Sequence, residues 1–318
     1  MTNERPIVVV AMGGHAFMQR GESGDIHDHE RNAIAICGSL MTLVERDYNM
    51  VVTHGNGPQV GNALLQSELT HGQVPFMPLD VLVANTEGFL GYVLQQALLN
   101  HLRRREIKRY VVTMITQVLV EPDDPAFQNP SKPIGPFLTK EQAEERRDKL
   151  GWKILDDSGR GWRRLVPSPK PVRVVQRLMI RDSAKAGHIV VACGGGGIPI
   201  VRGKDRNYEG IEAVIDKDLT SSVLAAEIGA ELLIILTDVP QAYIHYGQPG
   251  QKALGAVTLE EIEALQKEGH FGKGSMGPKV EAIVNFLKSG GKRGLITSPA
   301  KLGDALDGRA GTHFVGKI

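Results

Sequence analysis

Three glycine-rich loops are the features that most constrain what this chain can fold into. They are MGGHA at residues 12–16, HGNGPQVG at 54–61 and GSMGPK at 274–279, and the first two each follow an apolar run directly. Because glycine has no Cβ, its backbone N–H group can approach phosphoryl oxygens closely, and the residue can adopt positive φ without a clash. A single loop of this kind is explained equally well as an ordinary strand-to-helix turn. Three of them, together with Lys217 and Lys279, indicate a phosphoryl-transfer enzyme.

The apolar runs have the pattern of strands buried inside a parallel sheet. Most are continuous and β-branched rather than alternating, which is typical of strands covered on both faces. Segments with helical spacing lie between them, and Thr258 and Glu261 form a capping-box signal at the start of a further helix. The sequence therefore predicts a three-layer α/β/α sandwich around an open, mostly parallel central sheet. The expected strands cover residues 7–10, 50–52, 111–120, 188–192, 232–236 and 294–296, and the expected helices cover 32–47, 84–102, 219–228 and 279–288.

Residues 121–171 interrupt this alternation. The segment is rich in proline, glycine and charge, and it contains both tryptophans. A connection of this length with no structure of its own is uncommon in a compact domain. We therefore expect a small subdomain or lid, inserted between the strand that ends near Val120 and a helix at 172–186.

Composition narrows the class of protein. The 37 basic and 36 acidic residues nearly cancel, so the chain lacks the basic excess expected of a nucleic-acid-binding protein. Cys37 and Cys193 are too few for a disulfide framework and lack the spacing of a zinc site. No stretch approaches the roughly 18 apolar residues that a membrane span needs, and the N-terminus has no signal-peptide pattern. We expect a cytoplasmic protein that binds neither nucleic acid nor membranes.

Ten sequence blocks resemble those of the carbamate kinases, which belong to the amino acid kinase family. The blocks occur in the family's order and cover essentially the whole chain. They are VVVAMGGHA (8–16), HGNGPQVG (54–61), PLDV (78–81), GYVLQQAL (91–98), NPSKPIGPF (129–137), WRRLVPSPKP (162–171), GGGGIPI (194–200), EAVIDKDL (212–219), TDV (237–239) and GSMGPKVEA (274–282).

This resemblance implies reversible transfer of a phosphoryl group between ATP and carbamate, giving ADP and carbamoyl phosphate with Mg²⁺. It implies a homodimer that makes ATP from carbamoyl phosphate, as in arginine metabolism. It also implies one amino acid kinase domain over residues 1–318, in which residues 1–218, including the insertion, bind the acyl substrate and residues 219–318 bind the nucleotide. No residue is singled out as a metal ligand.

The resemblance further implies roles for individual residues. Lys217 would stabilise the transferring group, Asp218 would orient the lysines, and Lys279 would reach the ATP phosphates. Lys132 lies in the insertion and would reach the site when that lid closes. The substrate cradle would comprise Gly13, Gly14, His15, Gly55, Asn56 and Gly57, and the nucleotide site would comprise Gly195, Gly196, Thr237, Asp238, Tyr243, Met276 and Gly277. The turn at 194–197 is explained equally well as a tight turn that packs a helix on a strand.

The same lysines suit the implied chemistry on electrostatic grounds. Both reactants are anionic, and phosphoryl transfer depends mainly on positioning and charge neutralisation. The ammonium group of lysine is compact and mobile, so it can follow the phosphoryl group during transfer. Asp216 and Asp218 flank Lys217 and can anchor its side chain.

Two positions depart from the family's usual pattern. His15 replaces the usual asparagine after the first glycine pair, and Thr86-Glu87 replaces the usual serine-glutamine pair. If His15 is a tolerated substitute and Glu87 faces solvent or pairs with it, the protein is an ordinary carbamate kinase. The alternative is a paralogous kinase for another small carboxylate or carbamate-like substrate. A weakly catalytic binding protein is a third reading, which the retention of the lysines and Asp218 disfavours.

Overall fold

The computed structural model describes residues 5–14, 17–19, 21–157, 159, 161–272 and 275–316. Its central sheet has the strand order β15-β17-β16-β12-β1-β2-β9-β3, and all neighbours are parallel except β16 and β17. The predicted open, mostly parallel sheet is therefore confirmed. The bounds are β1 Ile7–Met12, β2 Asn49–His54, β3 Val111–Thr113, β9 Ile189–Val191, β12 Leu232–Leu236, β15 Ala256–Thr258, β16 Arg293–Thr297 and β17 Thr312–Val315.

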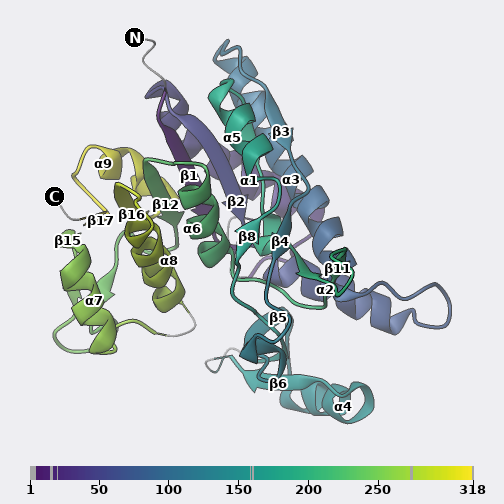
Figure 1. Cartoon of the computed structure of the whole chain (residues 1–318). Coiled ribbons are helices and arrows are strands. Elements are labelled where there is room, and N and C mark those ends of the chain that lie inside the picture. The colour runs from purple at the N-terminus through teal and green to yellow at the C-terminus, as the bar shows by residue number, and fades with distance from the viewer. Residues whose placement is uncertain are drawn as a thin grey trace.

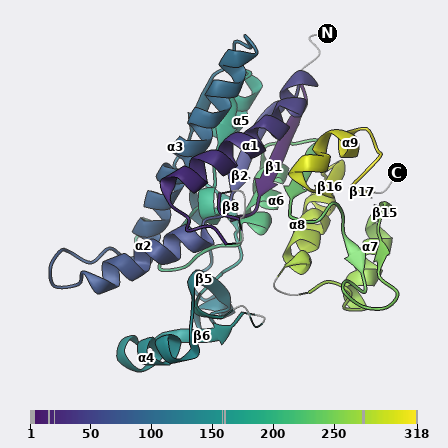
Figure 2. The ribbon, with the colours of Figure 1, turned by 180° about the vertical axis from the view of Figure 1, so that it is seen from behind.

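Helices cover both faces of this sheet, as the three-layer prediction requires (Figures 1 and 2). Alternate residues of the central strands belong to two apolar clusters: Val9 packs in one with α5, α6, α7 and α8, and Val10 packs in the other with α1, α3 and α9. This division follows from the alternation of side chains along a strand. The bounds are α1 Ile26–Glu45, α3 Leu79–Arg104, α5 Arg177–Lys185, α6 Lys217–Glu227, α7 Leu259–Lys267, α8 Met276–Lys288 and α9 Leu302–Leu306.

The predicted capping box at the start of α7 is confirmed. The hydroxyl of Thr258 accepts a hydrogen bond from the backbone N–H of Glu261 at 3.2 Å. The Glu261 carboxylate in return accepts from the backbone N–H of Thr258 at 2.7 Å. Two of the unpaired N–H groups at this helix start are thereby satisfied.

The prediction of a single strand over residues 111–120 is wrong. The chain leaves the central sheet after Thr113, and a second strand, β4 (Gln117–Leu119), joins a smaller sheet with the order β11-β10-β4-β8. The turn between them is held by Thr116, whose backbone N–H donates to Glu87 at 3.0 Å. A β-branched run predicts extended backbone but not which sheet it joins. The other strands of the small sheet are β8 Arg173–Val174, β10 Ile198–Arg202 and β11 Tyr208–Gly210, and a separate hairpin pairs β13 Tyr243–Ile244 with β14 Lys252–Ala253.

The insertion forms a subdomain that projects from the main body, as Figures 1 and 2 show. Its antiparallel sheet has the order β5-β7-β6, and α4 packs against β6 and β7. The main-body helix nearest to it is α2 (Gly57–Leu69), which begins immediately after the second glycine-rich loop. The insertion's elements are η2 Pro125–Phe127, β5 Lys132–Leu138, α4 Lys140–Leu150, β6 Lys153–Asp156 and β7 Trp162–Val166.

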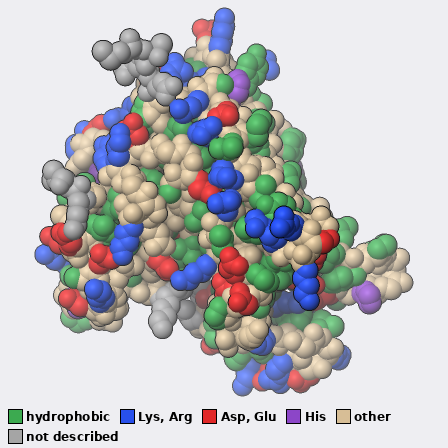
Figure 3. Space-filling view, viewed as in Figure 1, with side chains coloured by type: hydrophobic (Ala, Val, Ile, Leu, Met, Phe, Trp, Pro, Cys, Tyr) green, Lys and Arg blue, Asp and Glu red, His purple; other side chains and the backbone are tan. Residues whose placement is uncertain are grey.

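On the face drawn in Figure 3, lysine and arginine side chains are interspersed with aspartate and glutamate rather than gathered in one basic field. Within the described ranges, no helix combines the length and the apolar character needed to cross a membrane.

Candidate active site

Loops from four neighbouring strands meet at one edge of the central sheet. The strands β12, β1, β2 and β9 are adjacent and parallel, so their carboxyl ends lie at the same edge. Ligands of open α/β sheets commonly bind at this edge. The loops that follow these strands carry Gly13 and Gly14 after β1, Gly55, Asn56 and Gly57 after β2, the turn η3 (Gly194–Gly196) after β9, and Thr237 and Asp238 after β12.

Glycine is required where these loops touch one another. A Cβ added to Gly55 would lie 3.1 Å from the backbone nitrogen of Gly14. A Cβ added to Gly195 would lie 2.1 Å from Nδ2 of Asn56, and Gly195 has a φ of +68°. The tight-turn reading of residues 194–197 therefore accounts for these glycines through packing alone, and the contact of Gly195 and Gly196 with a nucleotide stays a prediction.

The amino end of α6 carries the charged centre of the site. Asp216 is the N-cap residue, and its Oδ1 accepts from the backbone N–H of Asp218 at 2.9 Å. One oxygen of the Asp218 carboxylate accepts from the ammonium of Lys217, and the other accepts from Lys279 of α8 at 3.0 Å. Nζ of Lys132 lies 2.5 Å from Oδ2 of Asp216. Three lysines from three separate parts of the chain thus converge on two neighbouring carboxylates.

Lys132 was expected to arrive only on closure of the insertion. In this structure its ammonium already contacts Asp216, so that contact requires no movement. Lys132 is the first residue of β5, and the insertion therefore contributes directly to the charged centre.

Hydroxyl groups fix the first turn of α6 against the sheet. The hydroxyl of Ser221 donates to the backbone carbonyl of Lys217 at 2.6 Å and also lies 2.6 Å from the hydroxyl of Thr53 on β2. The hydroxyl of Thr220 donates to the carbonyl of Gly196 at 2.9 Å. All three hydroxyl-bearing residues are buried, so these bonds hold the turn that presents Lys217 in one position.

The charged groups shift one another's protonation. Burial lowers the pKa of Lys217 to about 8, although the charge of Asp218 opposes this shift. Burial also acts on Lys279, but Asp218 prevails and raises the pKa of Lys279. Burial would raise the pKa of Asp216, but the positive charges of Lys132 and Lys217 outweigh it and hold that pKa well below its usual range. Burial opposes the same effect at Asp218, but the charges of Lys217 and Lys279 lower the pKa of that carboxyl too, so both carboxylates are ionised at neutral pH.

Thr86 and Glu87 of α3, the unusual Thr-Glu pair, contact the loops of the site. The amide of Asn56 donates to the hydroxyl of Thr86 at 2.9 Å. Glu87 is 1% exposed, and its two oxygens accept from the backbone N–H groups of Thr116 at 3.0 Å and Gly194 at 2.9 Å. The expectation that Glu87 could face solvent is wrong, because Glu87 is the internal acceptor for two loop N–H groups. Pairing with His15 cannot be assigned, since His15 lies outside the described residues.

Burial gives Glu87 an unusual protonation state. Removal from water raises its pKa to about 8, and the two backbone N–H bonds offset only part of that effect. The carboxyl is thus largely neutral at pH 7. The negative charge that Glu87 was expected to bring near an anionic substrate is mostly absent there.

His54, the last residue of β2, is a site residue that the sequence analysis did not single out. Its ring is fully buried, and burial lowers its pKa to about 4. Nδ1 lies 3.1 Å from the carbonyl oxygen of Gly55, while Nε2 has no hydrogen-bond partner among the described residues. A Cβ added to Gly194 would lie 2.5 Å from Nε2, so the neutral imidazole packs directly beneath the η3 turn. The sequence signal for His54 was its position immediately before the glycine-rich segment 55–57.

The residues expected to bind the nucleotide are spread over several elements. The hydroxyl of Thr237 donates to Asp238 at 3.0 Å, and the charge of Asp238 contributes to the raised pKa of Lys279. Met276 and Gly277 are the first two residues of α8, and Lys279 is its fourth. In the part of the chain that the structure describes, no hydrogen bond or ion pair joins Tyr243 of β13 to the lysines. Gly274, which begins the third glycine-rich run, is outside that part.

Asp216 also makes contacts that the sequence did not predict. It was expected to anchor Lys217, but its carboxylate caps α6 and pairs with Lys132 instead. The alternation Asp216-Lys217-Asp218 was the signal, because successive side chains at a helix start point in different directions. Sequence spacing alone does not say which acid meets which lysine.

Glu87→Gln tests the unusual protonation state through the pH dependence of stability. Because the pKa of Glu87 is raised from 4.5 to about 8 by folding, its contribution to stability is present at low pH and is lost as pH rises through about 8. Glutamine does not titrate. We therefore expect the free energy of unfolding of the wild type to fall relative to that of Glu87→Gln as the pH rises from about 5.5 to about 8.5. Urea titration measures both free energies. A difference between the two proteins that does not change with pH would contradict this assignment.

Known proteins of the same architecture identify the family. The family model described as the amino acid kinase family matches residues 6–298. The carbamate kinase of Thermococcus kodakarensis is 46% identical over 313 residues, which cover 97% of this chain and 98% of that protein. Structures of carbamate kinase from Giardia lamblia bound to citric acid and to AMP-PNP are each 40% identical, with TM-scores of 0.94 and 0.90, and each match covers 98% of this chain and 99% of that chain. The chain belongs to the carbamate kinases of the amino acid kinase family.

Proposed function

We propose that this protein catalyses the reversible transfer of a phosphoryl group between ATP and carbamate, forming ADP and carbamoyl phosphate. The observation that carries the proposal is the convergence of Lys132, Lys217 and Lys279 on Asp216 and Asp218 at the carboxyl edge of the sheet. A transferring phosphoryl group spreads negative charge over its oxygens, and positioned cations are what such a reaction requires.

Each residue has a role in this proposal. Lys217 stabilises the transferring phosphoryl group, Lys279 binds the nucleotide phosphates, and Lys132 binds the acyl substrate from the side of the insertion. Asp218 orients Lys217 and Lys279 through its two oxygens. The glycine-rich loops after β1 and β2 contribute backbone N–H groups to the acyl phosphate, so residues 1–218 bind the acyl substrate and residues 219–318 bind the nucleotide.

The carboxylates present fit a magnesium ion that is held mainly by the nucleotide. Mg²⁺ is usually bound through one or two carboxylates together with substrate phosphates and water. Asp216 and Asp218 supply that number of carboxylates, and because their oxygens already accept from lysines and from a backbone N–H, the ion would use only their remaining lone pairs beside the phosphates. In the described residues no group of three or more acidic, histidine or cysteine side chains forms a metal cage. The ion would supply positive charge to the nucleotide phosphates. The lysines of the chain bind and orient the remaining oxygens.

The likeness to the family also supports a proposal for the oligomeric state, the location and the direction of the reaction. We propose a cytoplasmic homodimer that makes ATP from carbamoyl phosphate within arginine metabolism. Exposed apolar side chains at Val81, Phe89 and Tyr92 lie on one face of α3 and support an interface between subunits there.

A second candidate function rests on His15. Where carbamate kinases usually have asparagine, a histidine directly after Gly13 and Gly14 in the sequence favours a paralogous kinase for a different small acid or carbamate-like substrate. Neutral Glu87 weakens this alternative, because it removes one of the two charge differences that suggested it. The deciding experiment measures ATP formation from ADP with carbamoyl phosphate beside a panel of other acyl phosphates.

Lys217→Ala tests the proposed mechanism. Because a single preorganised charge contact is worth about 2.7–4 kcal/mol in a transition state, we expect kcat for ATP formation from carbamoyl phosphate to fall by more than about a hundredfold. Circular dichroism should show an intact fold. Lys292→Ala is the control, because Lys292 is exposed and pairs with Glu231 at the amino ends of β12 and β16, the edge of the sheet opposite the lysine cluster. Retention of more than about a tenth of wild-type turnover by Lys217→Ala would remove this lysine from the mechanism.

His15→Asn distinguishes the two candidate substrates. If His15 is a neutral donor in place of asparagine, the variant should keep or raise carbamoyl-phosphate-dependent ATP formation. The pH profile of the wild type should then be flat around the ordinary histidine pKa, near 6.5. A near-inactive wild type that gains carbamate kinase activity from this substitution would show that the natural substrate is another acid.

A further inference from the structure

The insertion contacts the main body at a second place, away from the lysine cluster. Gly61 of α2 and Gly135 of β5 are packed backbone against backbone, and a Cβ added to Gly61 would lie 2.0 Å from the nitrogen of Gly135. Gly135 itself has a φ of +77°. Glycine at position 61 permits this approach, and glycine at position 135 permits the positive φ. The insertion is thus seated on α2 in one defined place rather than merely tethered by its two chain connections.

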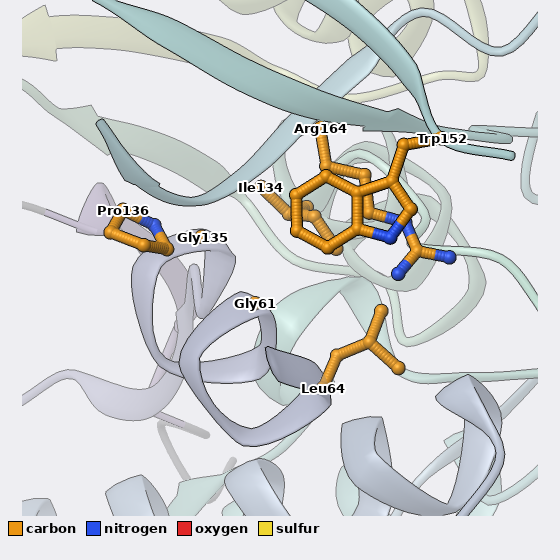
Figure 4. A pocket seen from close by; sticks show the side chains of 7 residues that line it. All are labelled: Gly61, Leu64, Ile134, Gly135, Pro136, Trp152 and Arg164. Carbon is orange, nitrogen blue, oxygen red and sulfur yellow. The ribbon is translucent and has the colours of Figure 1, made fainter. Parts of the chain in front are cut away.

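Glu68, near the end of α2, is bound by the insertion beside this glycine contact. Its Oε1 accepts from the indole N–H of Trp152 at 3.2 Å and from the guanidinium of Arg164 on β7. The guanidinium also lies over the Trp152 ring, 4.8 Å from its centroid. Figure 4 shows the Arg164 and Trp152 side chains stacked together above Leu64 of α2. One carboxylate therefore joins an aromatic N–H and a stacked cation from the insertion.

This cluster differs from an ordinary surface ion pair. The side chains of Glu68 and Arg164 are 13% and 23% exposed, and Oε2 of Glu68 is buried with no hydrogen-bond partner in the described ranges. Exposed pairs contribute little, but a pair shielded from water and held by a second hydrogen bond is stronger and fixes geometry. The exposed pair between Lys149 and Glu145 on α4 is the weaker kind, within the same insertion.

The contact is connected to Lys132 through the small sheet of the insertion. Arg164 of β7 pairs directly with Ile134 of β5, and Lys132 is two residues before Ile134 on that strand. Gly135 fixes the same strand on α2. The other end of α2 begins next to Asn56 of the substrate cradle, about 16 Å from Glu68 along the helix at 1.5 Å per residue. One helix thus holds the cradle at its first turn and the strand of Lys132 near its last.

We propose that Glu68 is a positioning residue for Lys132. By binding Arg164 and Trp152, it holds the insertion on α2 so that the Lys132 ammonium lies at the carboxylates of α6. Glu68 touches neither substrate and acts only through Lys132. The inference rests on the proposed function, because the role of Lys132 in binding the acyl substrate belongs to that proposal.

A double-mutant cycle tests the proposal through the kinetics of ATP formation from carbamoyl phosphate and ADP. Because small displacements of a positioned group are costly, we expect Glu68→Ala to lower kcat/KM for carbamoyl phosphate by about tenfold to a hundredfold and to leave KM for ADP unchanged. Glu68→Gln keeps an oxygen acceptor and should lose less. In the Lys132→Ala background, Glu68→Ala should cause no further loss. Glu145→Ala, which removes the exposed pair, is the matched control and should behave as the wild type.

Hydrogen exchange supplies a readout that does not depend on catalysis. We expect Glu68→Ala, but not Glu145→Ala, to speed amide exchange in β5 and β7 while exchange in the central sheet stays unchanged. Unchanged exchange in β5 and β7 would overturn the proposed seating of the insertion. Independent, multiplicative losses in the cycle, or wild-type activity in Lys132→Ala, would overturn action through Lys132. A wild type that is inactive with carbamoyl phosphate contradicts the proposed function instead, and the cycle is then run with the acyl phosphate that the enzyme accepts.

Discussion

The site depends on one carboxylate that binds two ammonium groups. Asp218 accepts from Lys217 with one oxygen and from Lys279 with the other, and it is 3% exposed. Two lysines this close would repel each other and lose protons in a buried setting without it. Asp218 keeps the pair charged while burial draws the pKa of Lys217 down to about 8. The result is a concentrated positive charge on a rigid helix terminus, which an anionic phosphoryl group can approach.

The rest of the fold positions this cluster from several sides. The sheet places four loops at one edge, and the hydroxyls of Thr53, Thr220 and Ser221 hold the first turn of α6 there. The buried carboxyl of Glu87 accepts from backbone N–H groups that would otherwise be buried without partners. The insertion contributes Lys132, which contacts Asp216. Hydroxyl groups, a buried carboxyl and the insertion thus together hold the loops and the lysines in place.

The sequence predicted the fold class and the capping box, because each depends on a local pattern. It also singled out charged residues that the structure brings together, and their roles stay predictions. Continuous β-branched runs, glycine-rich turns and the Asp-Lys-Asp alternation are all legible in one dimension. Three features of the structure could not be read from the sequence. The division of residues 111–120 between two sheets depends on the capture of Thr116 by Glu87, the pairing of Asp216 with Lys132 depends on where the insertion lies, and the neutral state of Glu87 depends on burial. Each of these is set by contacts between distant parts of the chain.

The most direct test of this account is the turnover of Asp218→Asn with carbamoyl phosphate and ADP. Asparagine has the same shape but offers one acceptor, and its amide N–H₂ faces a lysine. We expect the fold to persist, while kcat for ATP formation falls by at least about a hundredfold because the lysine charges are no longer held together. A variant whose turnover stays within about threefold of the wild type would contradict the claim that Asp218 organises the site.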